Sequence, residues 1–188
     1  MFNQMKKIVL ILFLVFAVKP LFSQIGIKGG LNFSSINNSD FEDLSGYQIG
    51  LFFHFKLSNV VHLNTGFNYS QKGFIVSKSF LGAPIDGLEV RINYVEIPVN
   101  IAFHIKTGQQ SSVFIQGGPY FGMTSGNTTE STDYGLNFGL GFEYMTFQIA
   151  FNYGLGLNQL FLTYQNRVYS ITIAGYFQLA SSKDVEIN

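Results

Sequence analysis

Two adjacent segments, 135–144 and 147–155, carry a large apolar side chain at every second position and are separated only by Met145 and Thr146. Successive side chains of a β-strand point to opposite faces of the sheet, so each segment is predicted to be a strand with one apolar face. The two-residue separation predicts a β-hairpin. The opposite face is rich in glycine and amides, which is not the composition of an ordinary water-exposed sheet.

The same alternation recurs along the chain and predicts eight strands of roughly 10 residues, the length that a tilted membrane strand requires. Residues just before Val95 alternate in the opposite phase, which predicts a β-bulge near Tyr94. Pro98 removes a ladder donor in the same strand and predicts a local irregularity. The predicted strands are 25–34, 47–56, 61–70, 95–104, 113–124, 135–144, 147–155 and 167–179.

The connections between these strands alternate between long and short. Seven connections in the order long, short, long, short, long, short, long are typical of an all-β fold, an eight-stranded antiparallel up-and-down transmembrane β-barrel with both termini periplasmic. Parallel strands would need helical crossovers, and no segment has helical apolar spacing. The short connections are 57–59, 106–111 and 145–146, and the long ones are 35–46, 73–88, 125–133 and 158–166.

The direction of the apolar face distinguishes two kinds of eight-stranded barrel. A transmembrane barrel points apolar side chains outward to lipid, whereas a soluble lipocalin-like barrel points them inward around a lipophilic ligand. The apolar set is dominated by Phe, Tyr, Leu and Ile, too bulky for the narrow interior of eight strands. The opposite set is mostly Gly, Ala, Ser, Asn and Gln with a few charges, whereas Lys and Glu dominate a soluble surface. We therefore expect the transmembrane barrel, with a soluble exported lipocalin-like carrier as the alternative.

Residues 1–23 have the pattern of a secretory signal peptide, with Lys6 and Lys7 ahead of the apolar stretch 8–18. A membrane-spanning helix needs about 20 apolar residues, which this stretch does not reach. We therefore expect residues 1–23 to be removed and residues 24–188 to form an outer-membrane β-barrel domain.

The composition of the exported part excludes some partners and some means of stabilisation. Removal of Lys6, Lys7 and Lys19 leaves eight basic against eleven acidic residues, so nothing in the charge indicates a nucleic-acid partner. The chain has no cysteine, so no disulfide stabilises it outside the cytoplasm.

Several polar side chains fall on the face predicted to line the lumen. An isolated charge in a dry lumen is costly, so these groups are expected to pair with one another or with trapped water. The network is interpreted as a plug of a barrel too narrow to conduct, and a proton or ion path is the alternative. The predicted lumen network comprises Lys28, Lys56, Glu96, Asn100, Gln116 and Glu143.

The three histidines fall near the periplasmic ends of their predicted strands, with Glu143 at the same level. Imidazoles and a carboxylate can bind zinc or copper, but no HExxH or similar spacing supports a site, so no metal and no cofactor are expected. The extracellular loops hold acidic and hydroxyl residues without a histidine to act as base, so no catalytic residue is assigned and no enzyme is expected. The histidines are His54, His62 and His104.

Several segments resemble the PorT family of small outer-membrane β-barrel proteins: GIKGGLNFS at 26–34, NYVEIPVNIAFHI at 93–105, GGPYFG at 117–122, DYGLNFGLGFEY at 133–144 and FNYGLGLNQL at 151–160. The resemblance implies an outer-membrane barrel and, through the family's namesake, a link to protein secretion across the outer membrane. Tyr176 and Phe177 resemble the aromatic signal read by the barrel-assembly machinery. They depart from that pattern because residues 178–188 follow them.

These patterns predict an integral outer-membrane protein with a structural, adhesion or secretion-assisting role. Its expected partners are outer-membrane lipid, the barrel-assembly machinery and an extracellular or secretion-system protein that binds the long loops. The apolar residues of the connection 73–88 fit either a partner contact or, as we prefer, a hairpin of the third and fourth strands that protrudes beyond the bilayer.

Overall fold

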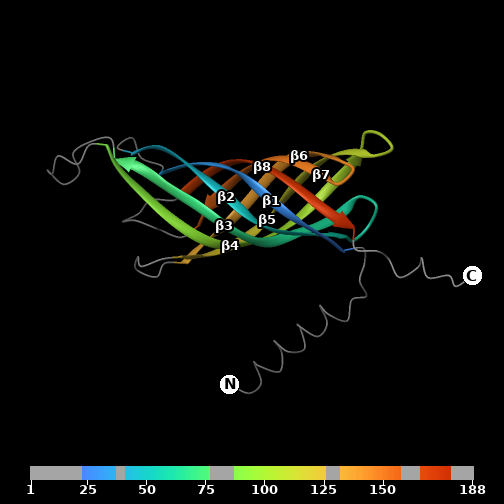
Figure 1. The fold of residues 1–188 in the computed structure, drawn as a ribbon, viewed down its shortest axis with the longest axis horizontal. Helices are drawn as coiled ribbons and strands as arrows, with labels where there is room; N and C mark the ends of the chain where they lie inside the picture. Colours follow the sequence, from blue (N-terminus) through green and yellow to red (C-terminus); the bar gives the residue numbers. More distant parts are fainter. Residues whose placement is uncertain (1–22, 37–40, 77–86, 126–131, 158–165, 179–188) are drawn as a thin grey trace, which may run out of the picture.

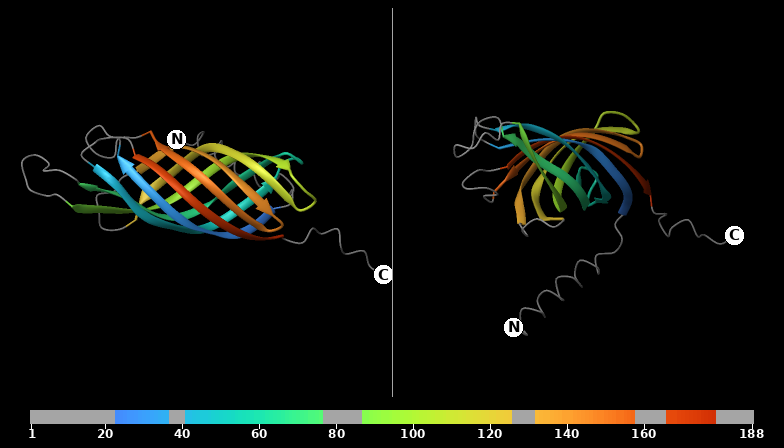
Figure 2. Two further views of the ribbon diagram at one scale, coloured as in Figure 1. Left: turned by 90° about the horizontal axis from the view of Figure 1, so that it is seen from above. Right: turned by 60° about the vertical axis from the view of Figure 1, so that its left-hand side comes forward.

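The computed structural model describes residues 23–36, 41–76, 87–125, 132–157 and 166–178. Each strand formed by these residues pairs antiparallel with the next, and the last pairs with the first, so the sheet closes into a barrel (Figures 1 and 2). The predicted eight-stranded up-and-down architecture is confirmed. The strands are β1 (Ser23–Ile36), β2 (Phe41–Lys56), β3 (Val61–Val76), β4 (Leu88–Lys106), β5 (Ser111–Thr124), β6 (Thr132–Tyr144), β7 (Phe147–Gly156) and β8 (Asn166–Gln178).

The register of the strand pairs determines how far the strands tilt. Followed once around the barrel from Ile25, the pairing returns to β1 at Ser35, ten residues further along. Eight strands with this stagger tilt by about 40° from the barrel axis. Each residue therefore advances roughly 2.5 Å along the axis.

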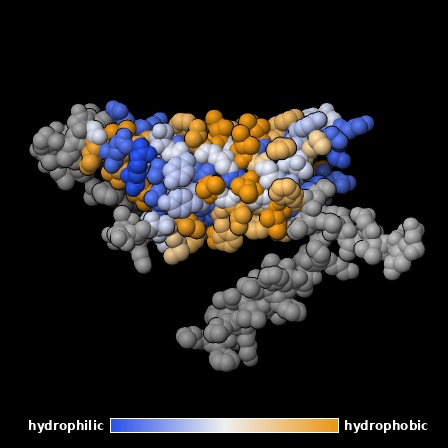
Figure 3. Space-filling model, viewed as in Figure 1, coloured by the Kyte–Doolittle hydropathy of each residue, from blue (hydrophilic) through white to orange (hydrophobic). Residues whose placement is uncertain are grey.

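The outward face forms an apolar band around the barrel. On β4 the outward side chains are between 38% and 66% exposed, and they cover about 25 Å along the axis, the height of the lipid-facing band of a transmembrane barrel. Figure 3 shows apolar side chains gathered around the middle of the barrel and hydrophilic ones towards its two ends. A lipocalin-like barrel would have its apolar side chains inside. The β4 side chains are Val95, Ile97, Val99, Ile101, Phe103 and Ile105.

Several tyrosines on the outward face lie towards one edge of this band, and Tyr144 lies towards the other. Tyr153 and Tyr169 pack with ring centroids 5.0 Å apart, and Tyr47 and Tyr134 are exposed on other strands. Such amphipathic rings are typical of the aromatic girdles at membrane interfaces.

Short turns connect β2 to β3, β4 to β5 and β6 to β7, close to where they were predicted. The β6–β7 turn is Met145–Thr146, and Met145 has a φ of 55°. β1 begins and β8 ends at the same end of the barrel, which we call the short-turn end, and the opposite end is the long-loop end. The long connections lie largely outside the described residues.

β3 and β4 extend further towards the long-loop end than predicted, as Figure 1 shows. Beyond the band their apolar phase reverses: Phe74 and Val76 are buried, while Glu89 and Arg91 lie outside and form an ion pair at 2.9 Å. This is the pattern of a sheet whose outer face meets water. The paired strands β3 and β4 continue to Val76, which fits the preferred interpretation of a hairpin that protrudes beyond the bilayer. Residues 77–86 lie outside the described part.

The bulge predicted near Tyr94 is wrong. The ladders of β4 with β3 and with β5 keep one register past Tyr94, whose ring is buried inside the barrel. The change of phase reflects a change of surroundings along a regular strand, from lipid to water. A register shift occurs instead in β2, between Asp43 and Gln48.

The irregularity predicted at Pro98 is present. The β3–β4 ladder lacks pairs at Ile97 and Pro98, and the Thr65 hydroxyl donates a 2.7 Å hydrogen bond to the Pro98 carbonyl. A side-chain hydroxyl therefore donates to the carbonyl at the point where the ladder of backbone hydrogen bonds is interrupted.

The predicted signal peptide, residues 1–23, lies outside the described residues except for Ser23, which begins β1. Its removal stays a prediction. Within the described residues, no helix has the length and apolarity needed to cross a membrane.

Candidate functional site in the barrel interior

A chain of amide side chains crosses the lumen. Asn64 of β3 donates to Gln116 of β5 at 2.9 Å, and Gln116 donates to Asn152 of β7 at 2.8 Å. Asn152 then donates to Thr172 of β8 at 3.3 Å. These bonds join opposite walls of the barrel, so side chains bridge the middle of the interior.

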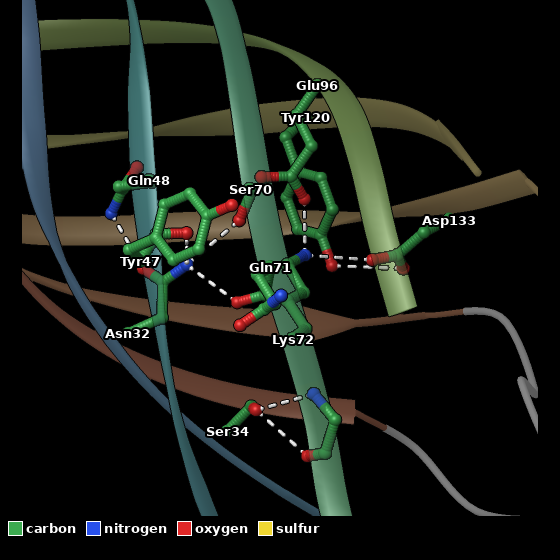
Figure 4. A network of polar contacts seen from close by, with 11 residues as sticks. Asn32, Ser34, Tyr47, Gln48, Ser70, Gln71, Lys72, Glu96, Tyr120 and Asp133 are labelled. Atoms are coloured by element: carbon green, nitrogen blue, oxygen red, sulfur yellow. Dashed lines mark hydrogen bonds and ion pairs between the residues drawn. The ribbon is translucent and has the colours of Figure 1, made fainter. Parts of the chain in front are cut away.

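A second set of hydrogen bonds ties β1 to β3 through the interior (Figure 4). Asn32 donates to the Ser70 hydroxyl at 2.9 Å and to the Gln71 carbonyl at 3.1 Å, and it accepts from Gln48 at 2.8 Å. β1 and β3 are not neighbours in the sheet, so these contacts fix the curvature of the wall formed by β1, β2 and β3.

A buried ion cluster lies between these polar layers and the long-loop end. Lys72 of β3 pairs with Glu96 of β4 and, at 3.0 Å, with Asp133 of β6. The Tyr120 hydroxyl donates to Asp133 at 3.2 Å, and the Lys72 ammonium lies 4.8 Å from the Tyr120 ring centroid and 5.2 Å from that of Tyr94. Figure 4 shows Lys72, Tyr120 and Asp133 converging from three strands. We call these five residues the lysine cluster.

Each ion of the lysine cluster has a partner of opposite charge, which offsets much of the cost of removing it from water. The cluster holds one cation and two carboxylates, and the Tyr120 hydroxyl and the aromatic rings supply the remaining contacts. It lies in the lumen near the level of Val95, where the apolar band ends. At this level charged groups from three strands hold one another across the lumen.

All three histidines of the chain meet near the short-turn end. His54, His62 and His104 are 0%, 5% and 3% exposed, and they come from the adjacent strands β2, β3 and β4. Their ring centroids are separated by 4.7 Å for His54 and His62, 4.0 Å for His62 and His104, and 5.7 Å for His54 and His104. Tyr176 stacks on His54 at 5.5 Å, and Phe114 stacks on His104 at 4.9 Å.

We call His54, His62 and His104 the histidine cluster. With their aromatic neighbours they lie in the lumen near the level of Phe103, at the other edge of the band. The Glu143 carboxylate lies beside the cluster, with Oε2 3.8 Å from His104 Nδ1, and Gln148 donates to this carboxylate at 3.1 Å.

Between the two clusters lies a cavity of about 80 Å³. Lys28, Asn68 and Asn100 line it, and the buried Oδ1 atoms of both asparagines have no protein partner within the described part of the chain. A buried water needs roughly 10–15 Å³ of such volume and polar neighbours. The cavity thus has the size and chemistry to hold a few waters.

The residues predicted for the lumen network lie in different places. Glu96 belongs to the lysine cluster, Gln116 to the amide chain, and Lys28 and Asn100 to the cavity wall. Glu143 lies beside the histidine cluster and Lys56 is half-buried at the end of β2.

The sequence analysis missed Lys72 and Asp133, which are the ion partners in the lysine cluster. Lys72 was left beyond the predicted third strand, and Asp133 was assigned to a loop. Lys72 lies two residues from Ser70 and Asp133 two residues from Gly135, so each is on the inward face of its strand. Longer predicted strands would therefore have placed both residues in the lumen.

Tyr176 and Phe177, predicted to form the assembly signal, point to opposite sides of β8. Tyr176 is buried and donates to the Met145 carbonyl at 3.2 Å, whereas Phe177 is 75% exposed. Their recognition by an assembly machinery stays a prediction.

The arrangement of an apolar outer band around a polar interior has a counterpart among known proteins. A family model described as an outer membrane protein beta-barrel domain matches residues 16–162. The chain belongs to this family. It is an integral outer-membrane β-barrel protein, and the apolar band of this barrel is the surface that meets lipid.

Solved structures share the architecture of this outer-membrane barrel. Neisserial surface protein A is 8% identical, covers 82% of this chain and 97% of its own, and has a TM-score of 0.52. Ail, the attachment invasion locus protein of Yersinia pestis, is 13% identical over 83% of this chain and 99% of its own, with a TM-score of 0.47. At such identities the likeness to Neisserial surface protein A shows the fold alone. No curated protein matches this chain.

Proposed function

We propose that this outer-membrane barrel neither conducts solutes nor catalyses a reaction, and that it anchors an extracellular surface in a structural, adhesion or secretion-assisting role. The observation that carries the proposal is a cluster of side chains in the lumen at each edge of the lipid-facing band. The lysine cluster lies at one edge, the histidine cluster lies at the other, and a cavity of about 80 Å³ lies between them. Water-filled channels occur in much wider barrels.

Electrical recording from the purified barrel in planar lipid bilayers tests whether the lumen is closed. We expect no conductance steps under conditions where a porin inserted in the same bilayers conducts. Steps that persist in the wild-type protein, and whose size responds to substitution of Gln116 in the amide chain, would refute a sealed lumen.

The long-loop end is proposed to face the extracellular medium, and the short-turn end and both termini to face the periplasm. Short periplasmic turns and long extracellular loops are the rule in bacterial outer-membrane barrels. The absence of cysteine provides a clean test with Ser58→Cys in a short turn and Leu88→Cys near the long-loop end. A membrane-impermeant maleimide should label only the Leu88→Cys variant on intact cells, and labelling of Ser58→Cys instead would reverse the orientation.

Residues 1–23 are proposed to be a signal peptide that is removed during export. The apolar stretch behind Lys6 and Lys7 supports this processing. The mass of the protein extracted from outer membranes should correspond to a chain that begins near Gln24, and recovery of the full-length mass would contradict it.

The absence of catalysis is proposed from the place of the histidines. All three are buried at the short-turn end, so none of them lies at the long-loop end of the described barrel to serve there as a general base.

A role in secretion is proposed from the resemblance to the PorT family. Assembly by the barrel-assembly machinery is proposed as well, with Tyr176 and Phe177 as the assembly signal. Deletion of the gene followed by comparison of secreted and surface proteomes tests the secretion role. Specific loss of secreted proteins, restored by the wild-type gene, supports it, while unchanged secretion with altered adhesion favours a surface-contact role.

A further inference from the structure

We propose that the histidine cluster is a binding site for a divalent transition-metal ion of the zinc and copper class. One ring nitrogen from each of the three histidines lies within 4.8 Å of one from each of the others. Their spacing along the chain indicated no such site, and the fold alone brings the three rings together. The proposal replaces the expectation that the protein holds no metal.

The free ring nitrogens provide independent support. His54 Nε2, His62 Nδ1 and His104 Nε2 are buried and have no hydrogen-bond partner in the described structure. A buried polar atom without a partner is costly, and three from adjacent strands in one small volume are unusual. A single metal ion would give all three a partner.

The second nitrogen of two of the rings is held by a neighbouring group. His54 Nδ1 lies 2.8 Å from Asn64 Oδ1, and His104 Nδ1 lies 3.1 Å from Ser112 Oγ. Asn64 Oδ1 can only accept, so His54 carries its proton on Nδ1 and presents a lone pair on Nε2. Metal-binding histidines are characteristically fixed in this way through the nitrogen that does not bind the ion.

The geometry requires only small movements of the ring atoms. Three points no more than 4.8 Å apart lie within about 2.8 Å of a common centre, and zinc to histidine nitrogen distances are about 2.0–2.1 Å. Each nitrogen would move inward by about 0.7 Å. The His62 and His104 rings are stacked at an interplanar angle of 28°, so one of them must also turn out of the stack. His62 is the second residue of β3 after a short turn, where this rotation is easiest.

The donor set determines the class of ion. Three imidazole nitrogens suit zinc, copper, nickel and cobalt, whereas calcium and magnesium require oxygen ligands. A fourth position remains open to water or a small ligand. The Glu143 carboxylate beside His104 supplies negative charge that favours a buried dication, and Lys56 at the end of β2 opposes it.

Metal titration of the full barrel in detergent micelles tests the proposal. Every histidine of the chain belongs to the cluster, so purification must use a tag without histidine. Zinc affinity is measured by competition with a chromogenic chelator, and cobalt serves as a spectroscopic probe of tetrahedral nitrogen coordination. We expect one ion per barrel and visible cobalt bands that zinc abolishes.

Matched variants separate this site from adventitious binding. His62→Gln should remove the cobalt bands and weaken zinc binding at least about tenfold, and Asn64→Ala should weaken it by about 10- to 100-fold. Glu143→Gln should weaken binding and Lys56→Gln should strengthen it. Asn137→Ala changes an amide that lines the cavity but contacts no histidine, and it should leave the affinity unchanged.

Folding of each variant is checked by the shift in gel mobility between unheated and heated samples. Less than one tenth of an ion per wild-type barrel, or equal affinity of the wild type and folded His62→Gln, overturns the proposal. If His62→Gln does not fold, unchanged affinity in both Asn64→Ala and Glu143→Gln overturns it equally. None of these outcomes bears on the proposed sealed lumen, which conductance tests separately.

Discussion

Replacement of Lys72 by methionine measures what the lysine cluster contributes to the stability of the barrel. Methionine has a similar length and no charge, so the substitution fills the same space and leaves the carboxylates of Glu96 and Asp133 facing one another. Tyr120 remains as a hydrogen-bond donor to Asp133. The substitution therefore turns a paired ion network into two buried anions without a cation.

The expected cost follows from burial and distance. The side chains of Lys72, Glu96 and Asp133 are 6%, 11% and 0% exposed, so water screens their interaction little. A pair of unit charges about 3 Å apart attracts by roughly 5 kcal/mol at an effective dielectric constant of about 20. Breaking a buried ion pair by removal of one partner costs about 3–5 kcal/mol. We expect about 4 kcal/mol, which lowers the ratio of folded to unfolded protein about a thousandfold.

Removal of the two carboxylates as well should restore most of the stability. The triple variant Lys72→Met, Glu96→Gln, Asp133→Asn contains no buried charge in the cluster, and replacement of a buried ion network by neutral groups is often close to neutral. We expect this variant to unfold within about 1–2 kcal/mol of the wild type. The difference between single and triple variants isolates the electrostatic contribution from the packing of the methionine.

Urea unfolding in lipid vesicles provides the assay, followed by circular dichroism and by the mobility of unheated samples on gels, because the chain has no tryptophan. A loss below about 1 kcal/mol in Lys72→Met, or a triple variant no more stable than the single one, would contradict the reasoning. Either result would mean that water reaches these ions and that the lumen is open at this edge.

Three further predictions concern the strands and one turn, and each is read from the midpoint of the same unfolding assay. Val99→Arg near the middle of the lipid-facing band should cost about 2–4 kcal/mol, whereas Val95→Arg at its edge should cost about 1 kcal/mol or less. A similar cost at both positions would argue against the placement of the band. Gly66→Ala should cost about 1–3 kcal/mol because a Cβ there would meet the backbone of β2, while Gly29→Ala, with its closest neighbour at 3.8 Å, should be nearly silent. Met145→Gly should gain about 0.5–1 kcal/mol because Met145 has a φ of 55°, and a loss would refute strain in that turn.

The strands within the lipid-facing band were predictable because the membrane constrains both of their faces. Lipid requires apolar side chains such as Val99 and Phe103 outside, and the narrow lumen requires small or polar ones such as Asn100 and Ala102 inside. The alternation therefore indicated both the strand and which of its two faces points to lipid. Closure followed because an unpaired strand edge in lipid is too costly to persist.

Outside the band the same rule fails, and the errors in strand boundaries lie there. Tyr94 and Phe74 are buried while Glu89 and Arg91 are outside, since the outer face of the extended β3–β4 pair meets water. A single alternation rule applied to both environments produced the wrong bulge near Tyr94. It also ended the third strand before Lys72.

The polar interior was predictable in composition but not in its pairings. The alternation along each strand identified Glu96 and Gln116 as side chains that point into the lumen. Which inward side chains lie at the same height along the barrel axis is decided by the ten-residue stagger of the barrel. Lys72 and Asp133 lie 61 positions apart, and no local pattern joins them. The histidines share this property, because their meeting depends on the registers of β2, β3 and β4 together.

The polar interior also gives the closed barrel an advantage over a partly formed sheet. The ions of the lysine cluster are carried by β3, β4 and β6, and the amide chain runs from β3 to β8. In an open sheet within lipid these groups would face hydrocarbon without partners, at a cost of several kcal/mol each. Closure of the barrel gives all these groups their partners at the same time. The last strand pairing, β8 with β1, is therefore cooperative with formation of the whole polar network. A barrel with an empty lumen would need no buried charges of this kind.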